Sequence, residues 1–175
     1  MTASEPAVSP YGSWKSPITS ALIVAQSIGL SEVRLDGSDV YWLEMRPRES
    51  GRCVVVRAVD GRGAADAIAA PFSARSRVHE YGGGAWTVCE STIYFSNDQS
   101  RRGEPPDRRL YRQRADASEP VPITPNGTWR YADGIVDRLR NRWIGVREDH
   151  TEASTSYPDN AIVTIDLGCP ETNAG

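Results

Sequence analysis

The feature that most constrains the fold is a repeated order of short β-strand patterns, with a period of roughly 50 residues. The second strand of each unit carries an aromatic ring, and these rings, 53 and 49 residues apart, are Tyr41, Tyr94 and Trp143. The third strands, 56 and 52 residues apart, are centred on Val55, Tyr111 and Val163. Four short strands in a unit of this length are typical of β-propeller blades.

The turns between strands repeat as well. Asp36-Gly37 is a hairpin signal between the first two strands, and turns recur at the same place at 89–91 and 137–141. The fourth-strand patterns, at 66–70 and 121–125, are the weakest, which is typical of outer edge strands, where a proline is tolerated. A β-sandwich also spaces short strands regularly. It does not explain the same strand order and loop placement in three units, so the propeller is favoured.

The predicted fold class is therefore all-β: an incomplete β-propeller of about three four-stranded antiparallel blades, preceded by one short helix. Ser16 can cap this helix and Gly29 can end it. The expected segments are a flexible lead-in at 1–15, the helix at 16–30, the partial propeller at 31–167 with blades at roughly 31–75, 82–125 and 130–167, and a loose tail at 168–175. A propeller needs about four blades to close. The sequence thus predicts a fragment or a piece that depends on assembly.

Composition excludes several classes of function. The net charge of −3 and the interleaving of Arg with Asp and Glu argue against nucleic acid. Three scattered cysteines without a CxxC pair suggest neither a disulfide framework nor a zinc site. The first ten residues do not form a secretory signal, and the apolar stretch 18–30 is too short and too polar to span a bilayer. We expect a cytoplasmic protein with no nucleic-acid or membrane partner.

Motifs for catalysis are sparse. No GxSxG nucleophile motif occurs, and the two histidines are His79 and His150. His79 precedes Glu80, but adjacent residues of an extended chain point to opposite sides, so a structural role is favoured over a general base. The glycines at 82–84 lack the Lys-Ser/Thr ending of a phosphate loop. The cluster 148–150 is interpreted as a solvated loop. We expect no catalytic, cofactor-binding or metal-binding residue, and no cofactor.

Six large aromatic residues are expected to form blade core rather than a ligand cage. They are Tyr41, Trp42, Trp86, Tyr94, Trp129 and Trp143.

Several segments resemble the N-terminal region of bacterial prolyl-oligopeptidase-family serine peptidases, in the branch related to acylaminoacyl peptidases and dipeptidyl aminopeptidases. The most specific segment is Arg77-Val78-His79-Glu80-Tyr81-Gly82-Gly83-Gly84-Ala85. Others, in the expected order, lie at 11–19, 34–37, 40–44, 93–97, 109–112, 130–134 and 147–150. The resemblance covers about Tyr11 to Leu167, nearly the whole chain.

Such family members combine a β-propeller with a C-terminal α/β-hydrolase domain that carries a Ser, Asp and His triad. The resemblance implies that the propeller caps the active site and filters peptide substrates by size. The region of the family that carries the triad has no counterpart in this chain, so the chain alone is expected not to be an enzyme. The implied partners are further blades, the hydrolase domain and peptide substrates. Two alternatives stay open: a stand-alone module that assembles through its exposed edges, or a truncated remnant without function.

Overall fold

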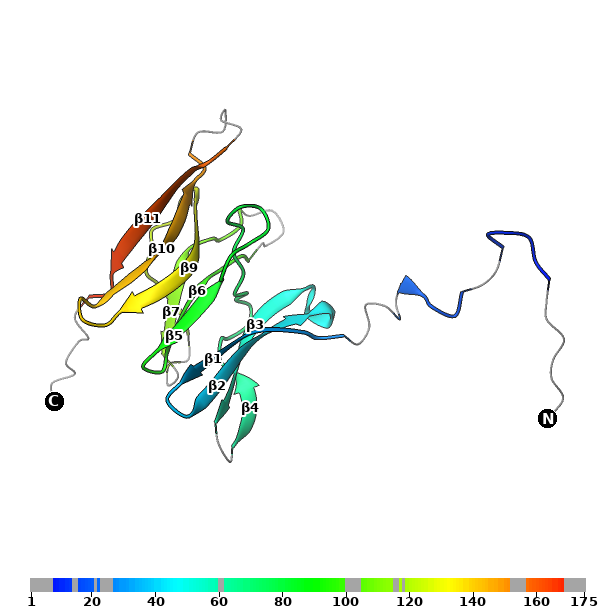
Figure 1. The fold of residues 1–175 in the computed structure, drawn as a ribbon, viewed down its shortest axis with the longest axis horizontal. Helices are drawn as coiled ribbons and strands as arrows, with labels where there is room; N and C mark the ends of the chain where they lie inside the picture. Colours follow the sequence, from blue (N-terminus) through cyan, green and yellow to red (C-terminus); the bar gives the residue numbers. More distant parts are fainter. Residues whose placement is uncertain are drawn as a thin grey trace.

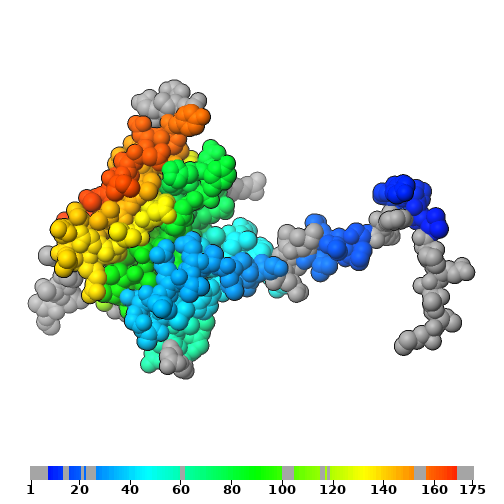
Figure 2. Space-filling view, viewed as in Figure 1, coloured from blue at the N-terminus to red at the C-terminus, as the bar shows by residue number. Residues whose placement is uncertain are grey.

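The computed structural model of this 175-residue chain describes residues 8–13, 16–20, 22, 27–59, 62–99, 105–114, 117, 119–151 and 157–168. Within them the chain forms three antiparallel sheets that lie next to one another like consecutive blades (Figure 1). The space-filling view shows the same three bodies in contact, with the N-terminal segment leading away from them (Figure 2). The expected all-β fold and its blade-like antiparallel sheets are confirmed.

Blade 1 has the strand order β1-β2-β3-β4, and blade 2 has the order β5-β6-β7-β8. Blade 3 has three strands among the described residues, in the order β11-β10-β9. The strands of blade 1 are β1 (Gly29–Asp36), β2 (Asp39–Arg46), β3 (Arg52–Val59) and β4 (Gly63–Asp66), with the 3-10 helix η1 (Pro47–Glu49) after β2. Those of blades 2 and 3 are β5 (Trp86–Cys89), β6 (Thr92–Ser96), β7 (Leu110–Arg114), β8 (Val121–Pro122), β9 (Trp129–Asp137), β10 (Arg142–Asp149) and β11 (Asp159–Asp166).

The expected hairpins between first and second strands are present in all three blades. Asp36 pairs with Asp39, Cys89 with Thr92, and the turn 138–141 joins β9 to β10. These turns gather at one end of the blades, which we call the turn end (Figure 1). The opposite end, called here the connection end, carries the connection 47–51, the described residues 97–99, 105–109, 150–151 and 157–158, and the inter-blade segment 67–85.

The prediction for the fourth strands is wrong in blade 1 and correct for Pro122 in blade 2. The fourth strand of blade 1 was expected at 66–70, but β4 ends at Asp66 and Ile68 is fully buried beyond it. The exposed strand of Gly, Ala, Ala and Asp has no hydrophobic pattern by which it could be predicted. The buried Ile68 that follows it produced the apolar pattern on which the prediction of a strand at 66–70 was based. Pro122 does lie in the outer strand β8, where it pairs with Tyr111.

The helix expected at 16–30 lies partly outside the described residues, which omit 21 and 23–26. Ser20 and Leu22 are helical, and Thr19 Oγ1 accepts a hydrogen bond from Leu22 N at 3.1 Å. Ser16 Oγ accepts a hydrogen bond from Ile18 N at 3.1 Å, as expected of a capping residue, but the described helical residues begin only at Ser20, after Thr19. Strand β1 already begins at Gly29, so the expected end of the helix at residue 30 is wrong.

Two hydrophobic clusters hold the blades together. The first joins blades 1 and 2, where the rings of Tyr41 and Trp86 lie 6.4 Å apart. The second joins blades 2 and 3 around Trp143, which is 2% exposed and meets Tyr131 edge to face. Four of the aromatic residues expected in the core are buried, and Trp42 and Trp129 are half-buried. Apolar burial between neighbouring sheets is the main stabilising term of such a stack.

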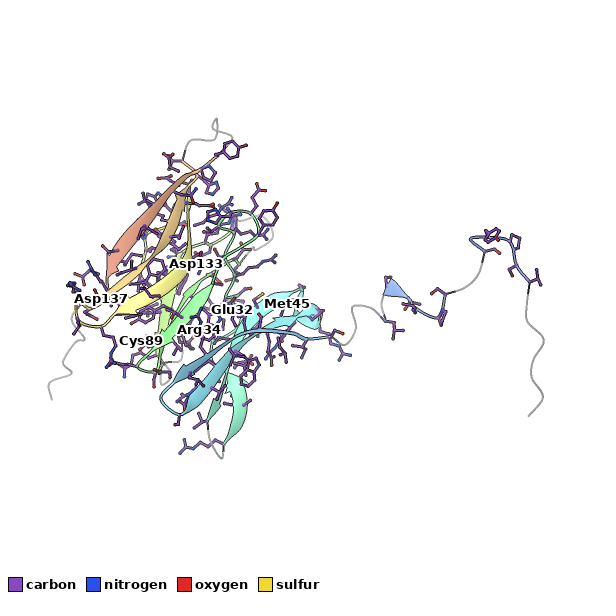
Figure 3. All side chains as sticks on the ribbon, in the orientation of Figure 1. Glu32, Arg34, Met45, Cys89, Asp133 and Asp137 are labelled. Carbon is purple, nitrogen blue, oxygen red and sulfur yellow. The ribbon has the colours of Figure 1, made fainter. Side chains whose placement is uncertain are left out.

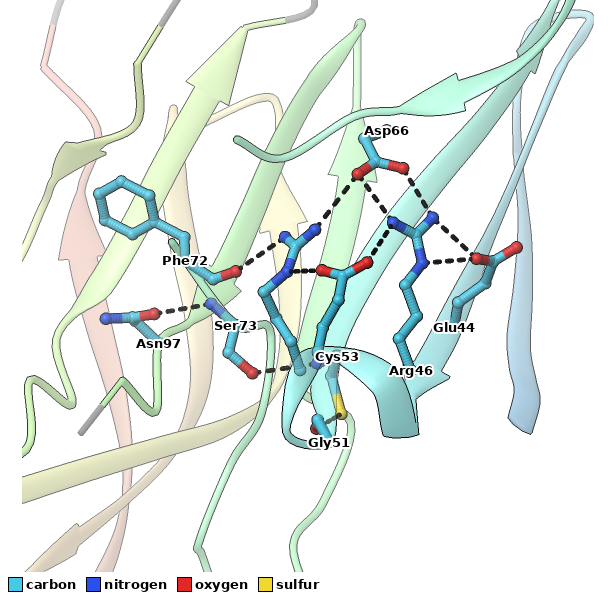
Figure 4. A network of polar contacts seen from close by, with 10 residues as sticks. Glu44, Arg46, Gly51, Cys53, Asp66, Phe72, Ser73 and Asn97 are labelled. Atoms are coloured by element: carbon cyan, nitrogen blue, oxygen red, sulfur yellow. Dashed lines mark hydrogen bonds and ion pairs between the residues drawn. The ribbon is translucent and has the colours of Figure 1, made fainter. Parts of the chain in front are cut away.

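The edge of blade 1 is tied by charges (Figure 4). Arg46 on β2 donates to Asp66 at the end of β4 through two nitrogens, at 2.7 and 2.9 Å, and so spans the strand between them. Hydrogen bonds from Arg46 lower the pKa of Asp66. Arg52 Nη2 also donates a hydrogen bond to Asp66, at 3.3 Å. Glu49 in η1 pairs with Arg52 as well. This network fixes the weakest strand of the blade.

Candidate functional site

The segment with the most specific sequence motif connects blade 2 to both of its neighbours. Arg75 N donates to Ser96 O at 2.9 Å, and Ala74 N donates to Cys53 O at 2.8 Å, so the chain crosses from blade 1 to blade 2 here. From Ser76 to Gly84 it then lies against blade 3. We call residues 76–84 the inter-blade loop.

A buried carboxylate anchors the inter-blade loop to blade 3. The Glu148 side chain on β10 is 2% exposed, and its Oε1 accepts a 2.6 Å hydrogen bond from the backbone N–H of His79. The imidazole of His79 lies 3.2 Å from the same oxygen, and that of His150 lies 3.0 Å from Oε2. Both histidines of the chain therefore meet at one carboxylate. A buried carboxylate needs such partners to offset its lost hydration.

Backbone groups of blade 3 complete the attachment. The carbonyl oxygen of Tyr131 accepts hydrogen bonds from Ser76 Oγ at 2.8 Å and from Ser96 Oγ at 2.6 Å. Val78 between these anchors is fully buried. Arg130 Nη1 donates to the carbonyl oxygen of Arg77 at 3.0 Å.

Glycines are required at the end of the inter-blade loop because blade 3 approaches its backbone closely. Gly84 N donates to Asp133 Oδ1 at 2.7 Å, and Asp133 N donates back to Gly84 O at 2.8 Å. A Cβ at Gly83 would lie 2.6 Å from Asp133 Oδ2. Gly82 has φ +84°, a conformation that glycine adopts without strain. The triple glycine is thus a structural feature of the blade junction.

The first strands of blades 1 and 3 bring charges to the same region (Figure 3). Arg34 lies 3.7 Å from Glu32 and stacks over the ring of Trp86. Glu32 and Asp133 both have positive φ, at 51° and 55°, where the registers of β1 and β9 shift. Burial raises the pKa of Glu32, because it disfavours the charged carboxylate.

Positive charge gathers beside the inter-blade loop. Arg77 Nε donates to Asp98 Oδ2 at 2.7 Å, and Arg108 lies 3.7 Å from the other oxygen of that buried carboxylate. The pKa of the Arg130 guanidinium is lowered, first by burial and then by repulsion from Arg108. Glu148 and Asp98 are the acidic groups that act against this lowering.

These contacts hold the inter-blade loop in place against blade 3. Within the described residues, no serine or cysteine hydrogen-bonds to either imidazole, and no group of three or more His, Cys, Asp or Glu is placed to hold a metal ion. The expectation that this segment has no catalytic, cofactor or metal residue stays a prediction. No helix of the described chain is long and apolar enough to cross a membrane.

The sequence interpretation of the 148–150 cluster as a solvated loop is wrong for Glu148, which is 1% exposed at the end of β10. Alternation gave no signal for this burial, because it places Glu148 on the same side of β10 as Ile144 and Val146, which are only half-buried. The pairing of His79 with Glu148, 69 residues apart, had no local sequence signal.

The blades and their inter-blade loop define this chain as a segment of a β-propeller domain. The sequence matches no protein-family model and no curated protein. Among solved structures it is similar to a puromycin-hydrolysing peptidase of Mycobacterium tuberculosis, with 34% identity over 93% of this chain and a TM-score of 0.72. A puromycin hydrolase is similar at 30% identity over 93% of this chain, with a TM-score of 0.74.

An S511A mutant of puromycin hydrolase, complexed with PGG, is similar at 29% identity over 91% of this chain, with a TM-score of 0.74. The chain corresponds to the propeller region of prolyl-oligopeptidase-family puromycin hydrolases. It spans about a quarter of the length of these peptidases, 25% in each case. The resemblance found in the sequence is confirmed.

Proposed function

We propose that this chain is the N-terminal propeller part of a prolyl-oligopeptidase-like serine peptidase, and that it gates peptide substrates to a hydrolase domain. The observation that carries the proposal is 34% identity over 93% of the chain to a puromycin-hydrolysing peptidase. Small aminoacyl compounds of the puromycin type, together with short peptides, are the substrate class that this similarity supports.

Apolar residues on the outer blades support a larger ring. On β1, Val33 and Leu35 are each 70% exposed, on the side opposite Arg34 and blade 2. On blade 3, Ile135 and Ile162 are 61% and 73% exposed. They share the face that points away from Trp143. Apolar faces of this kind are normally covered, and further blades are the matching cover.

The test is a comparison of substrates of different size with the full protein that carries this segment. The native protein is first sized in cell extract with an antibody against this segment, and a mass several times 19.2 kDa is expected. The purified protein should hydrolyse puromycin and short peptides and leave an unfolded protein chain of the same residue content intact. Equal cleavage of short and long substrates would refute gating, and no hydrolysis would refute the peptidase assignment.

The same open faces favour a second candidate, a module that assembles with copies of itself. Sedimentation of the native protein distinguishes the two. A concentration-dependent oligomer of 19.2 kDa units supports self-assembly, and a concentration-independent monomer of greater mass supports the peptidase.

A further inference from the structure

The tip of the inter-blade loop holds an aromatic ring in solvent. Tyr81 is 97% exposed, although the residues on both sides are fixed. Tyr81 N donates to His79 O at 2.6 Å, and Gly82 N donates to the carbonyl of the buried Val78 at 2.9 Å. The ring therefore projects from a tight turn whose base is bonded to blade 3.

The backbone at this tip is strained. His79 and Glu80 are consecutive residues with φ of 54° and 61°, and neither is glycine. Such a conformation persists where surrounding contacts impose it, here the bond from His79 N to Glu148. Strained residues of this kind concentrate at active sites, ligand clamps and switch regions. A flexible turn would expose Tyr81 without holding it in one direction.

Two of the exposed aromatic rings lie at the connection end. The exposed aromatic rings of the described residues are Tyr11, Tyr81 and Tyr157. Of these, Tyr81 and Tyr157 belong to segments at the connection end. Among the large hydrophobic residues described at the turn end, Leu139 is the most exposed, at 94%, and none of the exposed aromatic rings lies there.

We propose that Tyr81 is the anchor by which this propeller contacts the remaining body of the peptidase, and that the contact is made at the connection end. The inference rests on the proposed function. The length of the similar peptidases indicates what covers Tyr81. This chain matches only 25% of each of them, so the remaining three quarters of such a protein are available to contact this propeller segment. A tyrosine on a rigid base suits a protein surface, since its ring fills an apolar pocket and its hydroxyl group finds a polar partner.

The charges around Tyr81 define the partner surface further. The exposed Glu80 precedes Tyr81 in the chain, and the side chain of Arg77 in the same loop is 44% exposed, so charges of both signs flank the ring. The complementary surface is an apolar pocket with polar side chains at its rim. A peptide ligand and a second copy of the chain are the competing occupants.

Photo-cross-linking in the full protein identifies the occupant directly. The photoreactive residue p-benzoylphenylalanine is placed at Tyr81, and at Leu139 as the matched control, equally exposed but at the turn end. We expect intramolecular cross-links from position 81 to residues beyond 175, and no such cross-links from position 139. Tyr81→Ser should lower the unfolding midpoint of the full protein, while Leu139→Ser leaves it unchanged.

Three outcomes overturn the inference: cross-links from position 81 to a second molecule, to an added peptide, or to nothing beyond residue 175. A native protein of only 19.2 kDa would have no further body for Tyr81 to contact, and this result would overturn the inference as well. Hydrolysis of puromycin and peptides is measured separately on the unmodified protein. Cross-links in a protein without hydrolase activity would refute the proposed function and leave the contact established.

Discussion

Trp143 fills the space that two glycines leave in blade 3, which makes Gly134→Ala a sharp test of the packing. A Cβ at Gly134 would lie within 2.6 Å of the Trp143 ring, and its three nearest atoms all belong to that ring. A Cβ at Gly145 would lie within 2.6 Å of the same ring and 2.8 Å from the backbone oxygen of Ala132. Such approaches are far below van der Waals contact, so the ring or a strand must move.

The cost follows from the two ways of relieving this clash. Overpacking a filled core costs about 1–3 kcal/mol. Expelling Trp143 would sacrifice a ring that is 2% exposed, and truncating such a ring costs about 3–5 kcal/mol. A partial displacement of the Trp143 ring costs less free energy than its expulsion. We therefore expect Gly134→Ala to lower the free energy of unfolding by about 2–3 kcal/mol. With a urea slope of about 2 kcal/mol per M, the midpoint falls by roughly 1 M.

The assay is urea unfolding followed by far-ultraviolet circular dichroism, which does not depend on the tryptophan under study. Gly29→Ala is the matched control, because it is also a strand glycine and its nearest neighbour, Met45 Cβ, is at an ordinary 3.5 Å. Trp143→Phe in the same chain should remove most of the cost of Gly134→Ala. It should relieve Gly145→Ala less, since the backbone oxygen of Ala132 stays in place. Equal midpoints for the Gly134 and Gly29 variants, or strictly additive costs with Trp143→Phe, would refute the reasoning.

Three further predictions concern charged and titrating groups. Glu148→Ala leaves the part-buried N–H of His79 without its acceptor and should cost about 1 kcal/mol in urea unfolding, more than Glu148→Gln, whose amide oxygen can still accept. The folded-state pKa of Asp66 is lowered by its arginine partners, so its contribution is present above the ordinary carboxyl value and is lost as pH falls below about 4; in an acid titration, Asp66→Asn should flatten this loss. Burial and Asp107 raise the pKa of Tyr111 to about 12, so its ultraviolet titration should have a midpoint near that pH and move to lower pH in Asp107→Asn.

The blade pattern could be predicted because it is local. Hairpin signals such as Asp36-Gly37 and alternating apolar strands depend on neighbouring residues, and the structure has three antiparallel sheets where three units were expected. The fourth strand of blade 1 could not be placed, because its residues Gly63–Asp66 are all exposed and lie at an edge. Its position is set by the ion pairs from Arg46 to Asp66, which link residues 20 apart in the chain.

The candidate site was only partly visible in the sequence. The motif at 77–85 and the structural interpretation of its glycines were available from the residues, and the contacts of Gly84 with Asp133 agree with that interpretation. The burial of Glu148 was missed, since three consecutive polar residues at 148–150 look like a solvated turn. Burial there comes from the inter-blade loop of another blade covering the end of β10, a tertiary effect without a local pattern.

The blade junctions combine two kinds of contact. Apolar packing allows neighbouring blades to shift relative to each other, whereas hydrogen bonds from side chains to backbone groups fix one alignment of the two blades. At the turn end, Asp36 of blade 1 accepts hydrogen bonds from Glu90 N at 3.2 Å and Ser91 N at 2.6 Å of blade 2. Glu90 and Ser91 both have positive φ, 50° and 57°, without being glycine or asparagine, so the turn depends on an outside anchor.

Asp36→Ala removes both acceptor oxygens at once. Hydrogen exchange at the amides of Glu90 and Ser91 should accelerate, while the amide of His79 at the junction with blade 3, which is bonded to Glu148, keeps its rate. Because the turn is exposed, the loss of global stability should be small, about 1 kcal/mol. Unchanged exchange at residues 90 and 91 would mean that packing alone aligns the blades. Faster exchange at both junctions would mean that the blades open as one unit, and the carboxylate would then have no local role.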